Sequence, residues 1–125
     1  MTTDERLQRL KADVAAGYEL GLRPSRITIL SGNPGSTPVC GCAMGAAWVA
    51  KLGSVAAAVA EKRHRGNVTC SEFARWYGLT YHEVNAIVAG FDSSPVCRYY
   101  SRAAIDEALR VFFDFGVSLA KEHGL

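Results

Sequence analysis

The sequence predicts an all-α fold, a compact bundle of five or six helices in a single domain over residues 1–125. Three capping-box spacings, in which a threonine is followed three residues later by a glutamate, begin at Thr2, Thr69 and Thr80. Apolar residues recur at helical spacing in several segments, and no internal repeat or linker divides the chain. With 125 residues, 49% of them hydrophobic, the chain can bury a core without metal ions or disulfides.

The first helix is expected to end between Gly17 and Gly21, because Pro24 prevents easy continuation. Residues 27–30 (Ile-Thr-Ile-Leu) are β-prone, but no partner strand is evident, so we expect extended structure rather than a sheet. The glycine- and serine-rich stretch 31–38 has the composition of a loop. It lacks the Gly-Lys-Ser/Thr ending of a phosphate-binding loop, which favours a connector over a nucleotide site.

A central segment of small residues carries almost no charge. Residues 31–60 contain one charged side chain, Lys51, and the 22 residues from 39 to 60 are long enough to cross a bilayer. Lys51 near the middle of a mostly Ala, Gly and Ser stretch argues against insertion, so we expect no membrane partner. A buried helix broken at Gly53-Ser54 is expected instead. The charged N-terminus lacks the apolar core of a secretion signal, which predicts a cytoplasmic location.

Two short helices are expected within residues 70–90. The first should end at Gly78, and the second should run from Tyr81 to about Ala89 with Gly90 as its C-cap. A turn is expected at residues 92–95.

A last long helix is expected to start at Ser101. Phe112, Phe113 and Phe115 are too close in sequence to share one helix face, which suggests that one lies at the surface and that two copies form a homodimer through this helix. The apolar stripe expected along it is Ile105, Leu109, Phe112, Phe113, Gly116 and Leu119.

The helix–glycine–helix segment has the spacing of a helix-turn-helix unit. Ala74, Gly78, Val84 and Ile87 stand where the two helices of such a unit must touch or turn. The stretch FARWYGLTYHEVNAIVAG, residues 73–90, resembles the helix-turn-helix of phage repressors. The resemblance implies a non-enzymatic regulatory protein of phage type that binds double-stranded DNA, commonly as a two-fold dimer. Other packing positions of the expected corner are Phe73, Tyr77 and Leu79.

The resemblance also assigns a DNA-reading edge to the second helix. Asn85 would read adenine through two hydrogen bonds, and Thr80 would contact a base or a phosphate. This helix has no Lys or Arg, and the formal charge of the chain is only +2, so cations elsewhere must bind phosphates. The residues expected at the groove are Thr80, Tyr81, His82, Asn85 and Ala86. The expected phosphate contacts are Arg63 and Arg65, with Lys62 and His64, and further along Arg98 and Arg102.

Packing positions alone do not establish DNA contact, so a purely structural corner in a protein that binds a host or phage protein is the alternative. Cys-Ala-Met-Gly-Ala at 42–46, the segment 87–92 and Ser101-Arg102 are similar to small helical proteins of unknown function associated with phages and actinobacteria. Phe91 stands where those proteins have an asparagine. This resemblance implies a phage or prophage accessory protein and no activity.

The four cysteines are Cys40, Cys42, Cys70 and Cys97. A cytoplasmic location disfavours disulfides, and the CxC spacing, even with His64 added, matches no standard zinc site. We therefore expect free thiols, no metal and no cofactor.

A third hypothesis is an enzyme that uses Cys42, because a thiol at a helix start is activated by the helix dipole. Such an enzyme would need His82 as its base and Asn85 or Asp92 to orient the imidazole.

Overall fold

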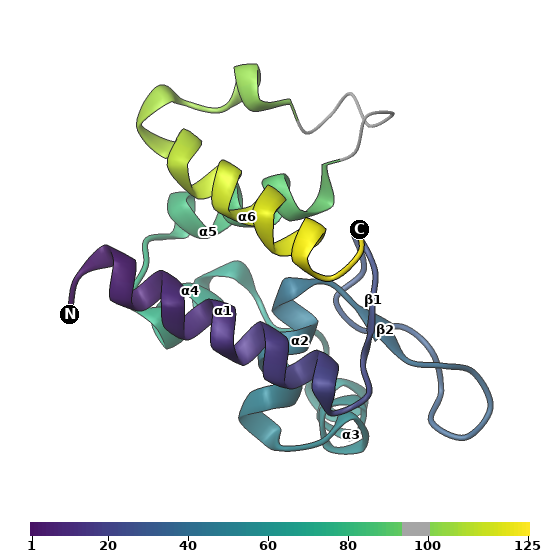
Figure 1. Ribbon diagram of the computed structural model, residues 1–125. Coiled ribbons are helices and arrows are strands. Elements are labelled where there is room, and N and C mark those ends of the chain that lie inside the picture. The colour runs from purple at the N-terminus through teal and green to yellow at the C-terminus, as the bar shows by residue number, and fades with distance from the viewer. Residues whose placement is uncertain (94–100) are drawn as a thin grey trace.

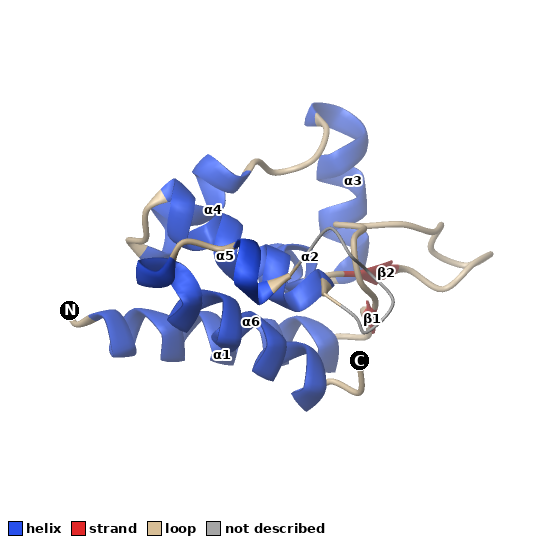
Figure 2. Ribbon diagram, turned by 90° about the horizontal axis from the view of Figure 1, so that it is seen from above, coloured by secondary structure: helices blue, strands red, loops and turns tan. Residues whose placement is uncertain are grey.

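Six α-helices and one pair of very short strands make up residues 1–93 and 101–125, the part of the chain that the computed structural model describes (Figures 1 and 2). The predicted all-α class is confirmed. The helices are α1 (Thr3–Glu19), α2 (Ala43–Leu52), α3 (Val55–Arg65), α4 (Cys70–Tyr77), α5 (Tyr81–Asp92) and α6 (Arg110–Glu122). The strands β1 (Arg23–Pro24) and β2 (Cys40–Gly41) pair in parallel, and the 3-10 turns η1 (Arg102–Ala104) and η2 (Glu107–Leu109) precede α6.

The first helix begins and ends as its sequence predicts. Thr2 caps it by accepting a hydrogen bond from the Glu5 N–H at 3.1 Å. Gly17 lets α1 lie against α2, because a methyl group there would overlap the backbone of Ala46. Residues 27–30 join neither strand, and the short sheet formed by β1 and β2 was not predicted.

The low-charge segment forms the centre of the core. Every residue from 43 to 49 is buried, and Trp48 is 1% exposed. Gly53, with a φ of 84°, ends α2 in the left-handed conformation, and Ser54 caps α3, which confirms the predicted break. Because α2 and α3 meet at 105°, no single helix within the described residues is long and apolar enough to cross a membrane.

The prediction that Gly90 caps α5 is wrong. The helix continues to Asp92, and Gly90 lies where α5 crosses α6, so close that a methyl group would overlap the carbonyl oxygen of Phe113. A methyl group on Gly116 of α6 would likewise overlap the carbonyl oxygen of Ile87 in α5. These two glycines therefore permit a close helix crossing, and neither of them ends its helix.

The predicted start of the last helix is also wrong. Residues 102–109 form η1 and η2, separated by extended backbone at Ile105 and Asp106, and α6 begins only at Arg110. Part of the predicted turn, residues 94–95, lies outside the described residues.

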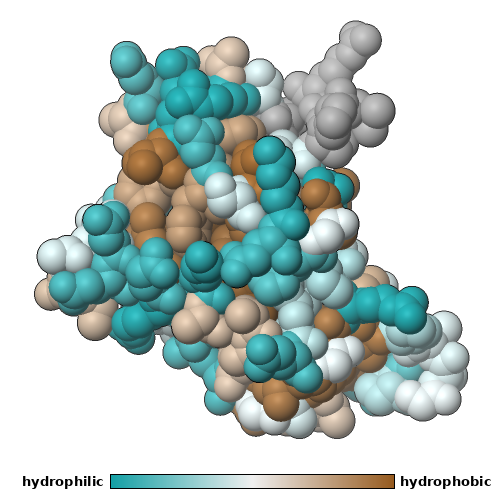
Figure 3. Space-filling model, in the orientation of Figure 1, coloured by the Kyte–Doolittle hydropathy of each residue, from teal (hydrophilic) through white to brown (hydrophobic). Residues whose placement is uncertain are grey.

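No phenylalanine of α6 is left at the surface. Phe112 and Phe113 are buried, and Phe115 packs against the core. The exposed apolar side chain is Val111, at the N-terminal end of α6, where apolar atoms show on the surface (Figure 3). The phenylalanine pattern therefore gives no support for a homodimer through this helix.

Candidate nucleic-acid interface

Helices α4 and α5 form the helix–turn–helix corner that the packing positions predict. Thr69 and Thr80 both make complete capping boxes, with Glu72 and Glu83 respectively. Gly78 adopts the left-handed conformation with a φ of 65°, so the chain turns within three residues. All the predicted packing positions other than this glycine are buried: Phe73, Ala74, Tyr77, Leu79, Val84 and Ile87.

The N-terminal turn of α5 presents the predicted reading residues to solvent. Thr80, Tyr81 and His82 are exposed, Tyr81 at 51%, and the rings of Tyr81 and His82 pack edge to face with centroids 5.7 Å apart. Asn85 is half-buried. Ala86, also expected to face the groove, is 2% exposed and belongs to the core, which corrects that expectation.

The basic residues expected to hold phosphates are engaged elsewhere. Arg63 donates to Asn33 Oδ1 at 3.1 Å, across to the 31–38 loop. Arg65 forms ion pairs with Glu61 and Glu72, which raise its pKa through the hydrogen bond to Glu72 above all. Lys62 donates to the carbonyl of Leu30.

Arg102 is likewise paired, since its guanidinium donates hydrogen bonds to both carboxylate oxygens of Asp114 at 2.8 and 3.1 Å. This bidentate contact lowers the pKa of the Asp114 carboxyl. Arg98 lies outside the described residues. Arg63, Arg65 and Arg102 are thus each engaged by another described side chain.

Four other cations border the corner, and sequence reasoning missed them. The Arg6 side chain lies against Gly78, since a methyl group on that glycine would meet Arg6 Nε at 3.2 Å. Arg9 stacks over the ring of Tyr77 with 5.9 Å between Cζ and the ring centroid. Lys51 Nζ lies 4.9 Å from the ring centroid of Trp76. Arg75, exposed on α4 itself, is the fourth.

None of these four cations forms an ion pair with another described residue. They come from α1, α2 and α4, and the views agree that the N-terminal end of α1 lies on the same side as the α4–α5 connection (Figures 1 and 2). We name Arg6, Arg9, Lys51 and Arg75 the basic border. Residues about 70 positions apart in sequence meet in it, which is why no local motif indicates it.

A partly buried hydrogen bond holds α1 in this position. The Tyr77 hydroxyl donates to Asp13 Oδ2 at 2.6 Å, and the Tyr77 side chain is fully buried. Burial and this carboxylate raise the pKa of Tyr77, so the phenol keeps its proton and remains a donor. Asp13 Oδ2 accepts this bond, and Asp13 forms no ion pair with a described residue of the basic border.

A pocket of about 580 Å³ opens beside the exposed edge of α5. One wall is α5 and the other is the segment that carries η1 and η2. The pocket has both polar and apolar walls, contributed mainly by His82, Asn85, Val88, Ile105, Asp106 and Leu109. His82 and Asn85, predicted to read DNA, are thus brought together at its rim.

Two acidic groups lie at the same edge and oppose a polyanion. Glu83 accepts the Thr80 N–H at 2.8 Å, so its carboxylate sits at the N-terminus of α5. Asp106 lines the pocket and is exposed. The positive charge that a phosphate contact at the corner needs therefore has to come from the basic border.

The geometry disfavours Cys42 as a nucleophile. Cys42 precedes α2 and is 2% exposed, and burial raises the pKa of its thiol to about 11 despite hydrogen bonds from the helix N-terminus. The nearby Asp92 raises this pKa further, whereas His82 lies in the pocket beside α5. A thiol with such a pKa remains protonated near neutral pH.

Cys40, Cys42 and Cys70 are free thiols, and Cys97 lies outside the described residues. No three His, Cys, Asp or Glu side chains in residues 1–93 and 101–125 gather as metal ligands do. Comparisons with protein-family models, with curated proteins and with solved structures find no match to this chain.

Proposed function

We propose that this chain is a non-enzymatic regulatory protein that binds double-stranded DNA through α4 and α5, as phage repressors do. The observation that carries the proposal is the juxtaposition of an exposed α5 N-terminus with the four unpaired cations of the basic border. A helix-turn-helix needs both, since base edges are read by the second helix and phosphates are held around it.

In this proposal, Tyr81, His82 and Asn85 reach base edges in the major groove, and the Asn85 amide suits adenine. The Thr80 hydroxyl accepts the Glu83 N–H and still has its own proton to donate to a phosphate. Arg6 and Arg9 then contact the backbone beside the turn. Such a protein would act in the cytoplasm, on phage or host DNA.

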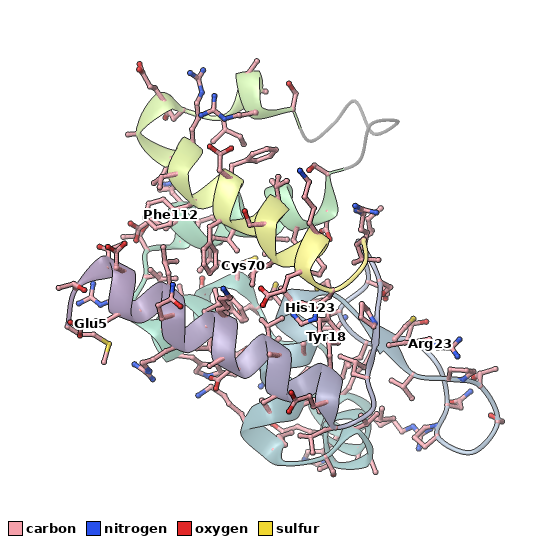
Figure 4. All side chains as sticks on the ribbon, viewed as in Figure 1. Glu5, Tyr18, Arg23, Cys70, Phe112 and His123 are labelled. Carbon is pink, nitrogen blue, oxygen red and sulfur yellow. The ribbon has the colours of Figure 1, made fainter. Side chains whose placement is uncertain are left out.

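The test is a fluorescence-anisotropy titration of duplex DNA at salt concentrations from about 50 to 200 mM. With three or four phosphate contacts, the slope of log K against log salt should be roughly −3. Arg6→Gln combined with Arg9→Gln should reduce this slope by about 2 and weaken binding to all sequences alike. Arg23→Gln is the control for loss of a positive charge away from the corner, because Arg23 is exposed at the end of the molecule opposite to Glu5 (Figure 4).

Absence of binding at the lowest salt, or equal losses in the double variant and in the Arg23→Gln control, would refute the proposal. Asn85→Ala adds a specificity readout, since it should relax the preference at one adenine and leave the salt slope unchanged. The stoichiometry on a duplex with two half-sites one helical turn apart reports whether two copies bind together.

A second candidate function is binding of a host or phage protein, and the pocket beside α5 favours it. A pocket with both polar and apolar walls can accept a protruding side chain of a partner. Under this alternative α4 and α5 are only a scaffold. A chain with intact helical content and no DNA binding at low salt would leave it as the better account.

A further inference from the structure

The turn at residues 26–28, directly after β1, is strained, and a buried carboxylate accepts a hydrogen bond from it. Ile27 has a φ of 77°, and the Thr28 N–H donates to the Arg26 carbonyl at 2.9 Å, which closes a three-residue γ-turn. A β-branched residue rarely adopts this conformation. The Ile27 N–H donates to Asp92 Oδ1 at 2.7 Å, and Asp92, the last residue of α5, is 4% exposed.

The strained turn places Arg26 at a second pocket, of about 320 Å³, at the C-terminal ends of α5 and α6. This pocket is separate from the one beside the α5 N-terminus, and the two share no lining residue. Its walls carry two cations, one hydroxyl and several apolar groups. The cations are Arg26 and Lys121, the hydroxyl belongs to Ser93, and the apolar groups include Val117, Ala120 and Leu125.

The Nε atom of Arg26 lacks an acceptor among the described residues. This Nε–H is buried, and the Arg26 guanidinium forms no ion pair with a described residue. Asp92 lies close enough for Arg26 to oppose the rise of the Asp92 pKa that burial causes, but Asp92 Oδ1 accepts its hydrogen bond from the Ile27 N–H. A buried guanidinium N–H without an acceptor is costly, and strained backbone commonly marks a ligand clamp.

We propose that this pocket binds a small monocarboxylate with a short aliphatic body. The carboxylate oxygens accept hydrogen bonds from Arg26 and meet the charge of Lys121, and the aliphatic body contacts Val117, Ala120 and Leu125. The guanidinium fork matches a carboxylate in shape and charge, and the apolar walls disfavour a fully hydrated anion such as phosphate. The proposal is independent of DNA binding, because it uses the opposite end of α5.

The experiment is an NMR titration of the ¹⁵N-labelled full chain with sodium hexanoate as the probe. Hexan-1-ol tests the apolar body without charge, and inorganic phosphate tests charge without the body. Hexanoate should shift the amides of residues 26, 93 and 117–121 saturably, at a concentration on the order of 1 mM. Hexan-1-ol and phosphate should each bind at least about tenfold more weakly.

Arg26→Gln should weaken hexanoate about tenfold or more, and Arg23→Gln, on the neighbouring exposed strand, should leave it unchanged. Lys121→Gln, on the exposed side of α6, gives a second variant that does not disturb the turn and should weaken hexanoate severalfold. Equal affinity for hexan-1-ol, equal or tighter binding of phosphate, insensitivity to both Arg26→Gln and Lys121→Gln, or absence of saturation would overturn the proposal.

Discussion

Removing the Tyr77 hydroxyl tests how α1 is fixed against the first helix of the corner. The hydroxyl donates to Asp13 Oδ2 at 2.6 Å, and Tyr77→Phe keeps the buried ring while deleting this one bond. A hydrogen bond to a charged group contributes about 1.5–3 kcal/mol, and half-buried Asp13 regains some water when its donor is lost. The expected loss in the free energy of unfolding is therefore about 1.5 kcal/mol.

For a chain of this length, unfolding entropy converts that loss into a decrease in Tm of about 6 °C. Urea unfolding followed by far-UV circular dichroism measures the free energy directly. Tyr81→Phe is the matched control, because Tyr81 is 51% exposed and should lose less than about 0.5 kcal/mol. Equal midpoints for the two variants would refute the view that this bond ties α1, and with it Arg6 and Arg9, to α4.

Three further outcomes follow from the packing and charges. Gly90→Ala should lower the free energy of unfolding by about 2 kcal/mol or more, because the added methyl group would overlap the Phe113 carbonyl. A rise of about 0.5–1 kcal/mol, which helix propensity alone predicts, would contradict the close crossing of α5 and α6. Burial raises the pKa of Asp92, so the folded state binds its proton more tightly than the unfolded chain does, and this group's contribution to stability falls as pH rises from the ordinary aspartate range through the raised pKa. In urea unfolding between about pH 4 and 7, Asp92→Asn should therefore remove that decline while keeping an acceptor for the Ile27 N–H, and an unchanged pH slope would exclude Asp92 as its source. Asp106→Asn should raise the affinity for duplex DNA about twofold at low salt in the anisotropy titration, and weaker binding would place the DNA elsewhere.

Local signals in the sequence predict most of the fold. The caps at Thr69 and Thr80 and the left-handed glycines at positions 53 and 78 depend only on residues three or four positions away, so their spacing is sufficient. Gly90 fails the same reasoning because its role is set by Phe113, a residue 23 positions further along the chain. A glycine near an expected helix end has the same local appearance whether it caps the helix or allows a close crossing.

The candidate interface could be predicted only in part, for the same reason. The exposure of Tyr81 and His82 can be predicted from the apolar periodicity of a single helix. The basic border, in contrast, combines side chains of three helices, α1, α2 and α4. The sequence points instead to basic residues that are neighbours in the chain, and Arg65 there is paired with Glu72. No local sequence pattern indicates the strained turn at Ile27, since Asp92, which accepts the hydrogen bond of the Ile27 N–H, lies 65 positions away.

Amide hydrogen exchange of the protein with and without duplex DNA at low salt tests the central proposal most directly. If α4 and α5 dock in the major groove, DNA should slow exchange at residues 78–85 and in the first two turns of α1, and should leave residues 23–41 unchanged. Slowed exchange confined to other segments, or no change at residues 78–85 in a sample where anisotropy shows binding, would contradict the proposal that this corner is the DNA-binding surface.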